Sequence, residues 1–183
     1  YMGFYKRLSF ALVFSSLALF AVTCSDSSTG PGNQTEFDSQ KTPGSSAKAF
    51  LVDDQYTNLQ IEIDYMPGHQ PTQEGLNSLQ TFLEERLNKQ NISLMSPNEI
   101  ESGNQSSYTA DDIRSLEEQH RDNRTEIDSN TLHVYFLMVD GEFNDGEGGG
   151  SNVLGIAYWN TSVAFFGQTI ESISGTPPTA PSE

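Results

Sequence analysis

The chain has 183 residues, 35% of them hydrophobic, and its 25 acidic residues outnumber nine basic ones, which gives a formal net charge of −16. This length suits a single domain with a modest core. Nucleic acid requires a basic binding surface, and so acidic a chain does not offer one. We therefore exclude nucleic acid as a partner.

The first residues have the pattern of a secretory signal, which we place at 1–23. Lys6 and Arg7 give it a basic start, and the apolar run 8–22 is too short to span a membrane comfortably. Cys24, the only cysteine, stands where bacterial lipoproteins carry the cysteine that is lipidated. We expect an exported lipoprotein of the bacterial cell envelope, periplasmic or at the surface, anchored in a lipid membrane through Cys24. A plain secreted protein with a chance cysteine is the alternative.

Residues 24–48 are polar and rich in Gly, Ser and Pro, so we interpret them as a disordered tether. From Cys24 onward the chain holds all 25 acidic residues but only seven basic ones, which is a net charge of −18. In one interpretation this charge serves solubility. In another it recruits Ca²⁺ or cationic substrates.

A strand, a helix and a second strand follow in the first part of the domain. Apolar and polar residues alternate from Leu59 to Tyr65, which predicts a half-buried strand. Thr72 is a suitable N-cap for a helix in which leucines recur at helical spacing. Ile92 and Leu94 begin a short second strand. This order predicts a right-handed βαβ unit with parallel strands.

One more helix and three more strands complete the predicted domain. Residues 109–112 resemble a capping box, in which Asp replaces the usual Glu, and they begin a helix that ends near His120. The nearly continuous apolar run 132–139 predicts a central strand covered on both faces. Residues 153–158 and 163–166 form two further neighbouring strands.

This order of elements resembles the N-terminal half of metzincin-like zinc peptidases. Three segments resemble secreted or lipid-anchored bacterial metalloproteases of this type more closely, and the resemblance extends over about residues 51–173: IEIDYMPGHQPTQEGLNSLQTFLEERLNK (61–89), LHVYFLMVDGE (132–142) and VLGIAYWNTSVAFFGQTIESI (153–173). It implies an α/β (α+β) fold over 49–174, incomplete at the C-terminus, with 175–183 as a terminal loop. The sheet would be mostly parallel and twisted, with about five strands, an antiparallel edge strand and two helices.

The resemblance implies a zinc-dependent peptidase, but the HExxH helix that binds zinc in this family is absent from the sequence. Its histidines, His69, His120 and His133, fall in three different predicted elements. No catalytic residue or zinc ligand can therefore be assigned, and we expect this chain alone to be inactive. The alternative is a non-catalytic surface lipoprotein that acts as a binding module. A third possibility is a chain that folds only with a partner that supplies the missing layer.

In the family, the antiparallel edge strand binds an extended peptide or protein substrate through backbone hydrogen bonds. The resemblance places this role on Leu154, Gly155, Ile156, Ala157 and Tyr158. Gly155 and Ala157 would leave room for the peptide to approach. The alternative is an ordinary edge strand with small side chains. Without the zinc helix, we also expect apolar residues of 132–139 and 163–166 to be exposed.

The acidic, glycine-rich stretch 140–152 offers oxygen ligands that suit calcium. The candidate ligands are Asp140, Glu142, Asn144, Asp145 and Glu147. The spacing is not that of an EF-hand. A mobile, solvated loop is the alternative to a calcium site.

Overall fold

A computed structural model describes residues 37–147 and 152–175 of the chain. The predicted signal and Cys24 lie outside the described residues. The described residues belong to one compact unit, 34–183. They form a mixed α/β domain with a mostly parallel sheet, an antiparallel edge pair and four helices, as the sequence predicted except for the number of helices.

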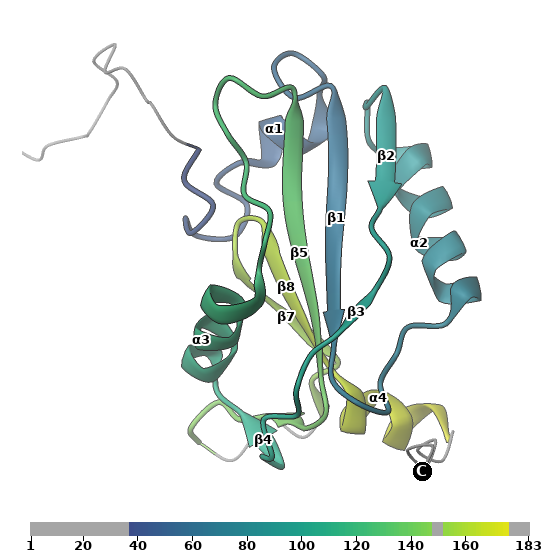
Figure 1. Ribbon diagram of the computed structural model, residues 1–183, viewed down its shortest axis with the longest axis vertical. Coiled ribbons are helices and arrows are strands. Elements are labelled where there is room, and N and C mark those ends of the chain that lie inside the picture. Colours follow the sequence, from purple (N-terminus) through teal and green to yellow (C-terminus); the bar gives the residue numbers. More distant parts are fainter. Residues whose placement is uncertain (1–36, 148–151, 176–183) are drawn as a thin grey trace, which may run out of the picture. The chain divides into compact units, whose positions relative to one another are not determined.

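The main sheet contains six strands, and five of them follow the order β2-β1-β5-β8-β7, with β3 pairing to the end of β1 (Figure 1). All neighbours in this sheet are parallel except β7 and β8. The strands are β1 (Asn58–Tyr65), β2 (Asn91–Leu94), β3 (Asn98–Glu99), β5 (Thr131–Val139), β7 (Gly155–Trp159) and β8 (Ser162–Phe166).

The predicted βαβ unit is confirmed. Helix α2 (Gln73–Arg86) begins after Thr72, whose hydroxyl accepts a hydrogen bond from the Gly75 N–H at 3.1 Å. Because this cap satisfies one of the free N–H groups at the helix end, the helix starts where the sequence predicted it. Strand β2 then returns parallel to β1 and places Ile92 beside Leu59.

Strand β5 is the central strand, because it pairs with β1 on one side and with β8 on the other. Helix α3 (Ala110–His120) precedes it and starts with the predicted capping box. The Thr109 hydroxyl accepts from the Asp112 N–H at 3.2 Å, and the Asp112 carboxylate accepts from the Thr109 N–H at 2.9 Å. Both the central strand and the capping box are therefore confirmed.

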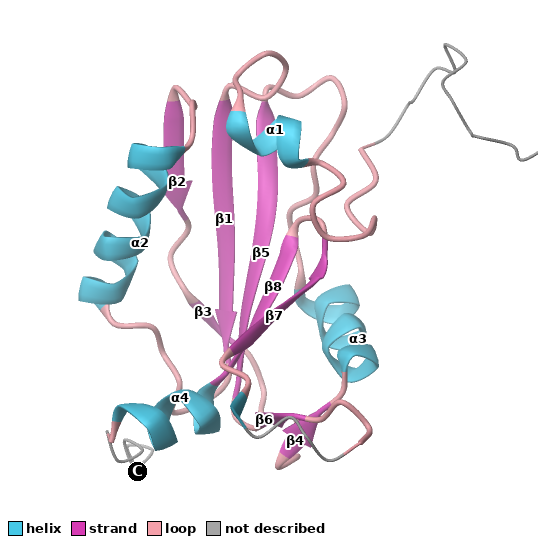
Figure 2. Ribbon diagram, turned by 180° about the vertical axis from the view of Figure 1, so that it is seen from behind, coloured by secondary structure: helices cyan, strands magenta, loops and turns pink. Residues whose placement is uncertain are grey.

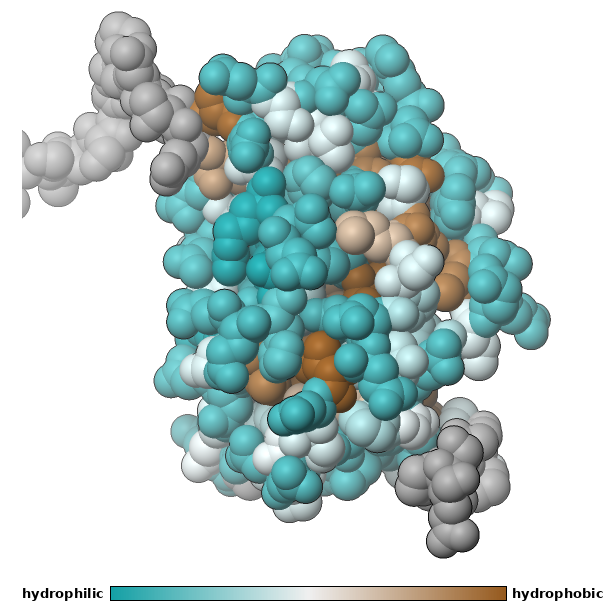
Figure 3. All heavy atoms as spheres, viewed as in Figure 1, coloured by the Kyte–Doolittle hydropathy of each residue, from teal (hydrophilic) through white to brown (hydrophobic). Residues whose placement is uncertain are grey.

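The two faces of the sheet are covered by different helices (Figures 1 and 2). We call them the α2 face and the α3 face. The α2 face is packed by α2 and by the short helix α1 (Ala47–Leu51), and its buried cluster is Tyr56, Leu59, Ile61, Ile63, Ile92, Leu132 and Val134. The α3 face carries the larger cluster, Met66, Ile100, Tyr108, Ile113, Tyr135, Leu137, Val139, Tyr158, Ala164 and Phe166. From the α3 side the surface is mostly hydrophilic, with scattered apolar patches (Figure 3).

Several helices and strands of the structure were not predicted from the sequence. They are α1, β3, the small parallel sheet of β4 (Ser107–Tyr108) and β6 (Glu142–Phe143), and α4 (Gly167–Ser174), which continues directly from β8. Strand β6 belongs to the stretch 140–152, for which the sequence indicated a calcium site or a mobile loop.

The structure also describes residues 37–48 of the predicted tether and places them against the domain. The Phe37 and Tyr56 rings meet edge to face at 5.5 Å, and the Asn160 N–H donates to the Lys41 carbonyl at 2.9 Å. The ammonium of Lys89 stabilises the next segment, residues 49–56. It donates hydrogen bonds to the carbonyls of Ala49, Val52 and Tyr56 at 2.5–2.6 Å.

Candidate functional site

The candidate site is the outer side of β7, the antiparallel strand at one edge of the sheet. Strand β7 pairs with β8 only, and no other strand of the described ranges 37–147 and 152–175 lies beyond it. Its sequence, GIAYW, has no charged residue and no proline. Natural proteins commonly protect exposed edges with such residues, because an open edge can pair with another chain. This edge is therefore available for strand addition.

The register of the β7–β8 pair determines which backbone groups face outward. The Phe166 N–H donates to the Leu154 carbonyl at 3.0 Å, so these two residues form a hydrogen-bonded pair. Hydrogen-bonded and non-hydrogen-bonded pairs alternate along an antiparallel ladder. Gly155, opposite Phe165, and Ala157, opposite Val163, are therefore in non-hydrogen-bonded pairs. Their N–H and C=O groups point away from β8, toward the free edge.

A bulge limits the regular part of this edge. The pairing shifts between Ala157 and Trp159, so Tyr158 has no direct partner on β8. Because a bulge increases the local twist, it ends the straight segment that a second strand can follow. The outward groups of Gly155 and Ala157 thus lie together on a short, straight segment before the strand bends.

Of the five residues predicted to bind a substrate, three are exposed and two face the core. The Leu154 side chain is 48% exposed, and Gly155 and Ala157 are also exposed. Ile156 packs against the cluster of the α3 face, and Tyr158 is buried within it. Burial, together with the nearby Glu117 carboxylate, raises the pKa of the Tyr158 hydroxyl. Ile156 and Tyr158 therefore hold the strand in place.

Gly155 also has a structural reason to be glycine. A Cβ atom at this position would lie 2.7 Å from the Ala164 carbonyl oxygen and 3.2 Å from the Phe165 ring. Strands β7 and β8 approach too closely here for a side chain. The missing side chain thus serves the β7–β8 pairing as well as access to the edge.

A buried ion pair anchors the strands beneath α3. The Arg121 guanidinium donates to the Glu117 carboxylate at 2.7 Å, and both side chains are 0% exposed. It also donates to the Ser162 hydroxyl at 3.2 Å and to the His133 carbonyl at 3.0 Å. These bonds join the end of α3 to β5 and β8. They hold β8 in place, which is the strand that pairs with β7.

Two buried carboxylates on β1 were missed by the sequence analysis. Glu62 accepts hydrogen bonds from the backbone N–H groups of Asp122 and Asn123 at 2.7 and 2.8 Å. Asp64 accepts from the Tyr135 hydroxyl at 2.8 Å, and burial raises the pKa of its carboxyl. Their oxygens are engaged by the chain's own groups, so we interpret them as structural.

His133 lies beside this network on β5, and its titration predicts a pH effect. Burial, followed by the nearby Arg121 charge, lowers the pKa of His133 below its ordinary value of 6.5. A group with a lowered pKa contributes stability above its unfolded pKa, and that stability is lost as the pH falls through the folded pKa.

Between pH 7.5 and 5.5 the melting temperature of the parent chain should fall more than that of His133→Gln. We expect a difference of about 1–3 °C, because His133 is only partly buried and solvent weakens the effect. Thermal melts at the two pH values measure it, and equal falls would contradict the assignment.

The described residues do not fit a zinc site. His69 lies after β1 and pairs with Glu171 of α4 at 3.2 Å, His120 ends α3, and His133 lies on β5. Within 37–147 and 152–175 there is no group of three or more His, Cys, Asp or Glu side chains that could hold a metal ion. No zinc chemistry is therefore derived from these residues.

The calcium prediction falls on a stretch that the structure describes up to Glu147. The Asp140 carboxylate accepts hydrogen bonds from the hydroxyls of Tyr108 (2.5 Å) and Ser102. The side chains of Asn144 and Asp145 accept from the backbone N–H groups of Gly146 and Glu147, both at 2.8 Å, while Glu142 belongs to β6. The five candidate ligands thus do not converge in the described structure, and calcium binding stays a prediction.

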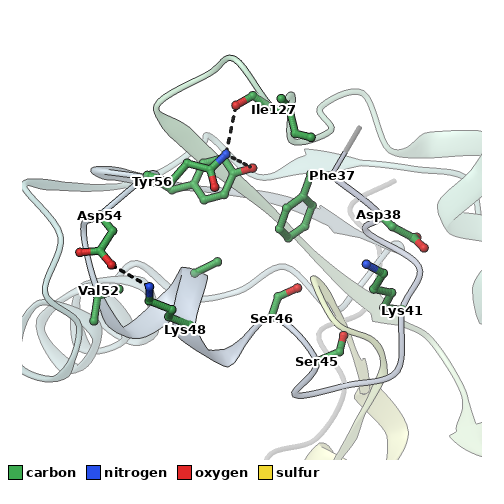
Figure 4. Close-up of a pocket in the computed structure, with 12 residues that line it drawn as sticks. Phe37, Asp38, Lys41, Ser45, Ser46, Lys48, Val52, Asp54, Tyr56 and Ile127 are labelled. Carbon is green, nitrogen blue, oxygen red and sulfur yellow. Dashed lines mark hydrogen bonds and ion pairs between the residues drawn. The ribbon is translucent and has the colours of Figure 1, made fainter. Parts of the chain in front are cut away.

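Two hollows in the described part of the chain bear on the choice of site. One, of about 610 Å³, lies between residues 37–48 and the segment 52–56 (Figure 4). Its charged side chains include both signs, with Lys48 paired to Asp54 at 2.9 Å, so they do not converge on one type of ligand. The other is an apolar groove of about 240 Å³ on the α2 face, which extends from Leu83 of α2 to Ala157 of β7.

Comparisons with known proteins do not identify the chain. No protein-family model, curated protein or solved structure was found to match it. A search of the described helices for a membrane span also found none of sufficient length and apolar character.

Proposed function

We propose that this domain binds an extended peptide segment along the free edge of β7. The observation that carries the proposal is the outward direction of the Gly155 and Ala157 backbone groups on an edge without charge or proline. A peptide added there would form hydrogen-bonded pairs with both residues. Binding of this kind, in which a peptide extends a sheet, obtains affinity from main-chain hydrogen bonds.

We further propose that this edge is the substrate-binding side of an exported, zinc-dependent peptidase. The sequence resemblance and the mostly parallel sheet with its antiparallel edge strand support this role. Since the described residues offer no zinc site, the chain would contribute the binding frame and not the hydrolytic groups. The expected result is that bound peptides stay intact, with or without added zinc, when analysed by mass spectrometry. Zinc-dependent cleavage by this chain would contradict the assignment.

The second candidate is a non-catalytic envelope lipoprotein that uses the same edge as a binding module. The observation that favours it is the engagement of Glu62, Asp64 and Asp140 in internal hydrogen bonds. The DNA that follows codon 183 in the source distinguishes the two. An open frame that encodes HExxH would support the peptidase, and a stop codon there would support the binding module.

A proline substitution at position 157 tests the binding edge. Ala157 donates no ladder hydrogen bond to β8, so Ala157→Pro should preserve the β7–β8 pair while removing one outward N–H. Loss of this donor also leaves a peptide carbonyl unpaired, so we expect peptide affinity to fall about tenfold or more. Fluorescence anisotropy with a library of labelled seven-residue peptides measures the affinity.

Ala157→Ser is the matched control, because it keeps both the N–H and a small side chain. Its affinity should stay within about twofold of the parent, which is the usual range for a surface substitution. Melting curves of both variants should match the parent curve. A parent chain that binds no peptide of the library, or a proline variant that folds and binds normally, would overturn the proposal.

A further inference from the structure

The α2 face of the sheet carries two rows of apolar side chains that end at β7. Across the strands, Phe136 lies beside Val163, which lies beside Ala157. One step along the sheet, Met138, Phe165 and Gly155 form a parallel row. Both rows are half-buried at their inner members and exposed at the edge. In each row the edge member is the smallest, so the apolar surface stops short of the edge.

A strand added to β7 would continue these rows. Residues directly opposite each other on neighbouring strands have their side chains on the same face. The peptide residues that pair with Ala157 and Gly155 would therefore have side chains on the α2 face. They would be two positions apart in the peptide. Large apolar side chains at those two positions would cover Val163 and Phe165, which β7 itself leaves half-exposed.

The open space on this face supports large side chains. The apolar groove of about 240 Å³ is bounded by Ala157, Val163 and Phe136 on the sheet and by Leu83 on α2. The rings of Phe136 and Phe165, one from each row, meet edge to face at 5.4 Å. A leucine or phenylalanine side chain over Ala157 would contact this surface and remove it from water.

Charge complementarity indicates which charge the partner peptide carries. The chain has a net charge of −16 with nine basic residues in all. The guanidinium of Arg114 lies 6.0 Å from the centre of the Trp159 ring and is paired with Asp111 at 2.7 Å. A basic peptide is attracted to such a molecule, and an acidic one is repelled.

We infer that the partner of this edge is a basic, extended peptide segment with large apolar residues two positions apart. The inference rests on the proposed function and specifies its ligand. A second copy of the chain fits less well. It would bring the same negative charge, and pairing β7 with itself would place small residues opposite small ones.

Four seven-residue probe peptides test the inference by fluorescence anisotropy at low salt. The first has lysine at both ends and leucine at positions three and five, with serine elsewhere. The others replace both leucines by serine, move the leucines to positions three and four, or replace the lysines by glutamate. We expect the first peptide to bind about 10–30-fold more tightly than the serine peptide, because two leucines become partly buried. The shifted and acidic peptides should be weaker by about fivefold or more.

Val163→Thr provides the variant on the protein side, since threonine has the shape of valine but is more polar. It should reduce the preference for leucine over serine to below about fivefold, because the surface that leucine covers becomes less apolar. A melting curve checks that the variant is folded. The peptide series tests the inference even if this variant is destabilised.

The outcomes separate this inference from the proposed function. If Ala157→Pro blocks binding but leucine and serine peptides bind equally, the inference is wrong and the binding edge stands. If the peptide with glutamate ends binds more tightly than the peptide with lysine ends, the inference that the partner is basic is wrong. If no peptide binds and the chain self-associates through an edge that Ala157→Pro blocks, a second copy is the occupant, and both proposals fail.

Discussion

Replacing Arg121 by methionine should lower the free energy of unfolding by about 3–5 kcal/mol, because a buried carboxylate would lose its close, fully buried counterion. The Glu117 carboxylate, which is 0% exposed, would keep only the hydroxyl of Ser162 at 3.0 Å and the partly exposed guanidinium of Arg124 at 3.7 Å. The substitution also removes the hydrogen bonds to Ser162 and to the His133 carbonyl. Urea denaturation followed by circular dichroism measures the change.

Two further variants make this result specific. Arg114→Met removes an exposed cation of the same helix, whose partner Asp111 is 89% exposed, and it should change stability by less than about 1 kcal/mol. Combining Arg121→Met with Glu117→Met removes both buried charges and should restore a large part of the lost stability. A double variant that is as unstable as the sum of the single ones would show that hydrogen bonds, and not the orphaned charge, dominate.

Replacing Gly155 by valine should separate β7 from β8 and lower the free energy of unfolding by about 1–3 kcal/mol, as overpacking does elsewhere. The added Cβ would lie 2.7 Å from the Ala164 carbonyl oxygen, which belongs to the backbone and cannot move away as a side chain does. Peptide binding should be lost with the strand, since its outward groups would no longer be held in line. Denaturation curves and anisotropy measure the two effects.

Ala157→Val is the matched control on the same strand and face. Ala157 is exposed, and valine is favoured in strands, so its stability should stay within about 0.5 kcal/mol of the parent. Similar losses in both variants would mean that bulk at the edge, and not the close approach at Gly155, destabilises the pair.

The sequence predicted the sheet well because hydrophobic pattern and capping chemistry are local signals. The continuous apolar run identified β5 as the central strand, and Thr72 and Thr109 marked the starts of α2 and α3. Strand β1 was harder to interpret. Its alternating acids predicted one solvated face, but Glu62 and Asp64 are 6% and 2% exposed. Their hydrogen-bond partners are distant in the chain, the nearest being Asn98, 34 residues from Asp64, and no local pattern reveals such partners.

The candidate edge was only partly accessible to sequence reasoning. The pattern placed a strand at 153–158, which the structure has at Gly155–Trp159, and the resemblance gave it an edge position. Which residues direct their backbone outward depends on the register with β8, which a one-residue shift would reverse. The short elements α1, β3, β4 and β6 depend on tertiary contacts such as those of Tyr108, and their sequences carry too few residues for a periodic signal.

The pairing of β1 with β5 also has a consequence for folding kinetics. Asn58 pairs with Thr131, so the two central strands meet only after the residues between them, 66–130, have been placed. Closing so long a loop before the strands can pair makes folding slow, as is general for parallel sheets with distant contacts. Until residue 139 is synthesised, β1 has only the short β2 and β3 as partners on one side. Chains interrupted before that point should therefore remain open to proteases, and the cooperative unit should form only when β5 arrives.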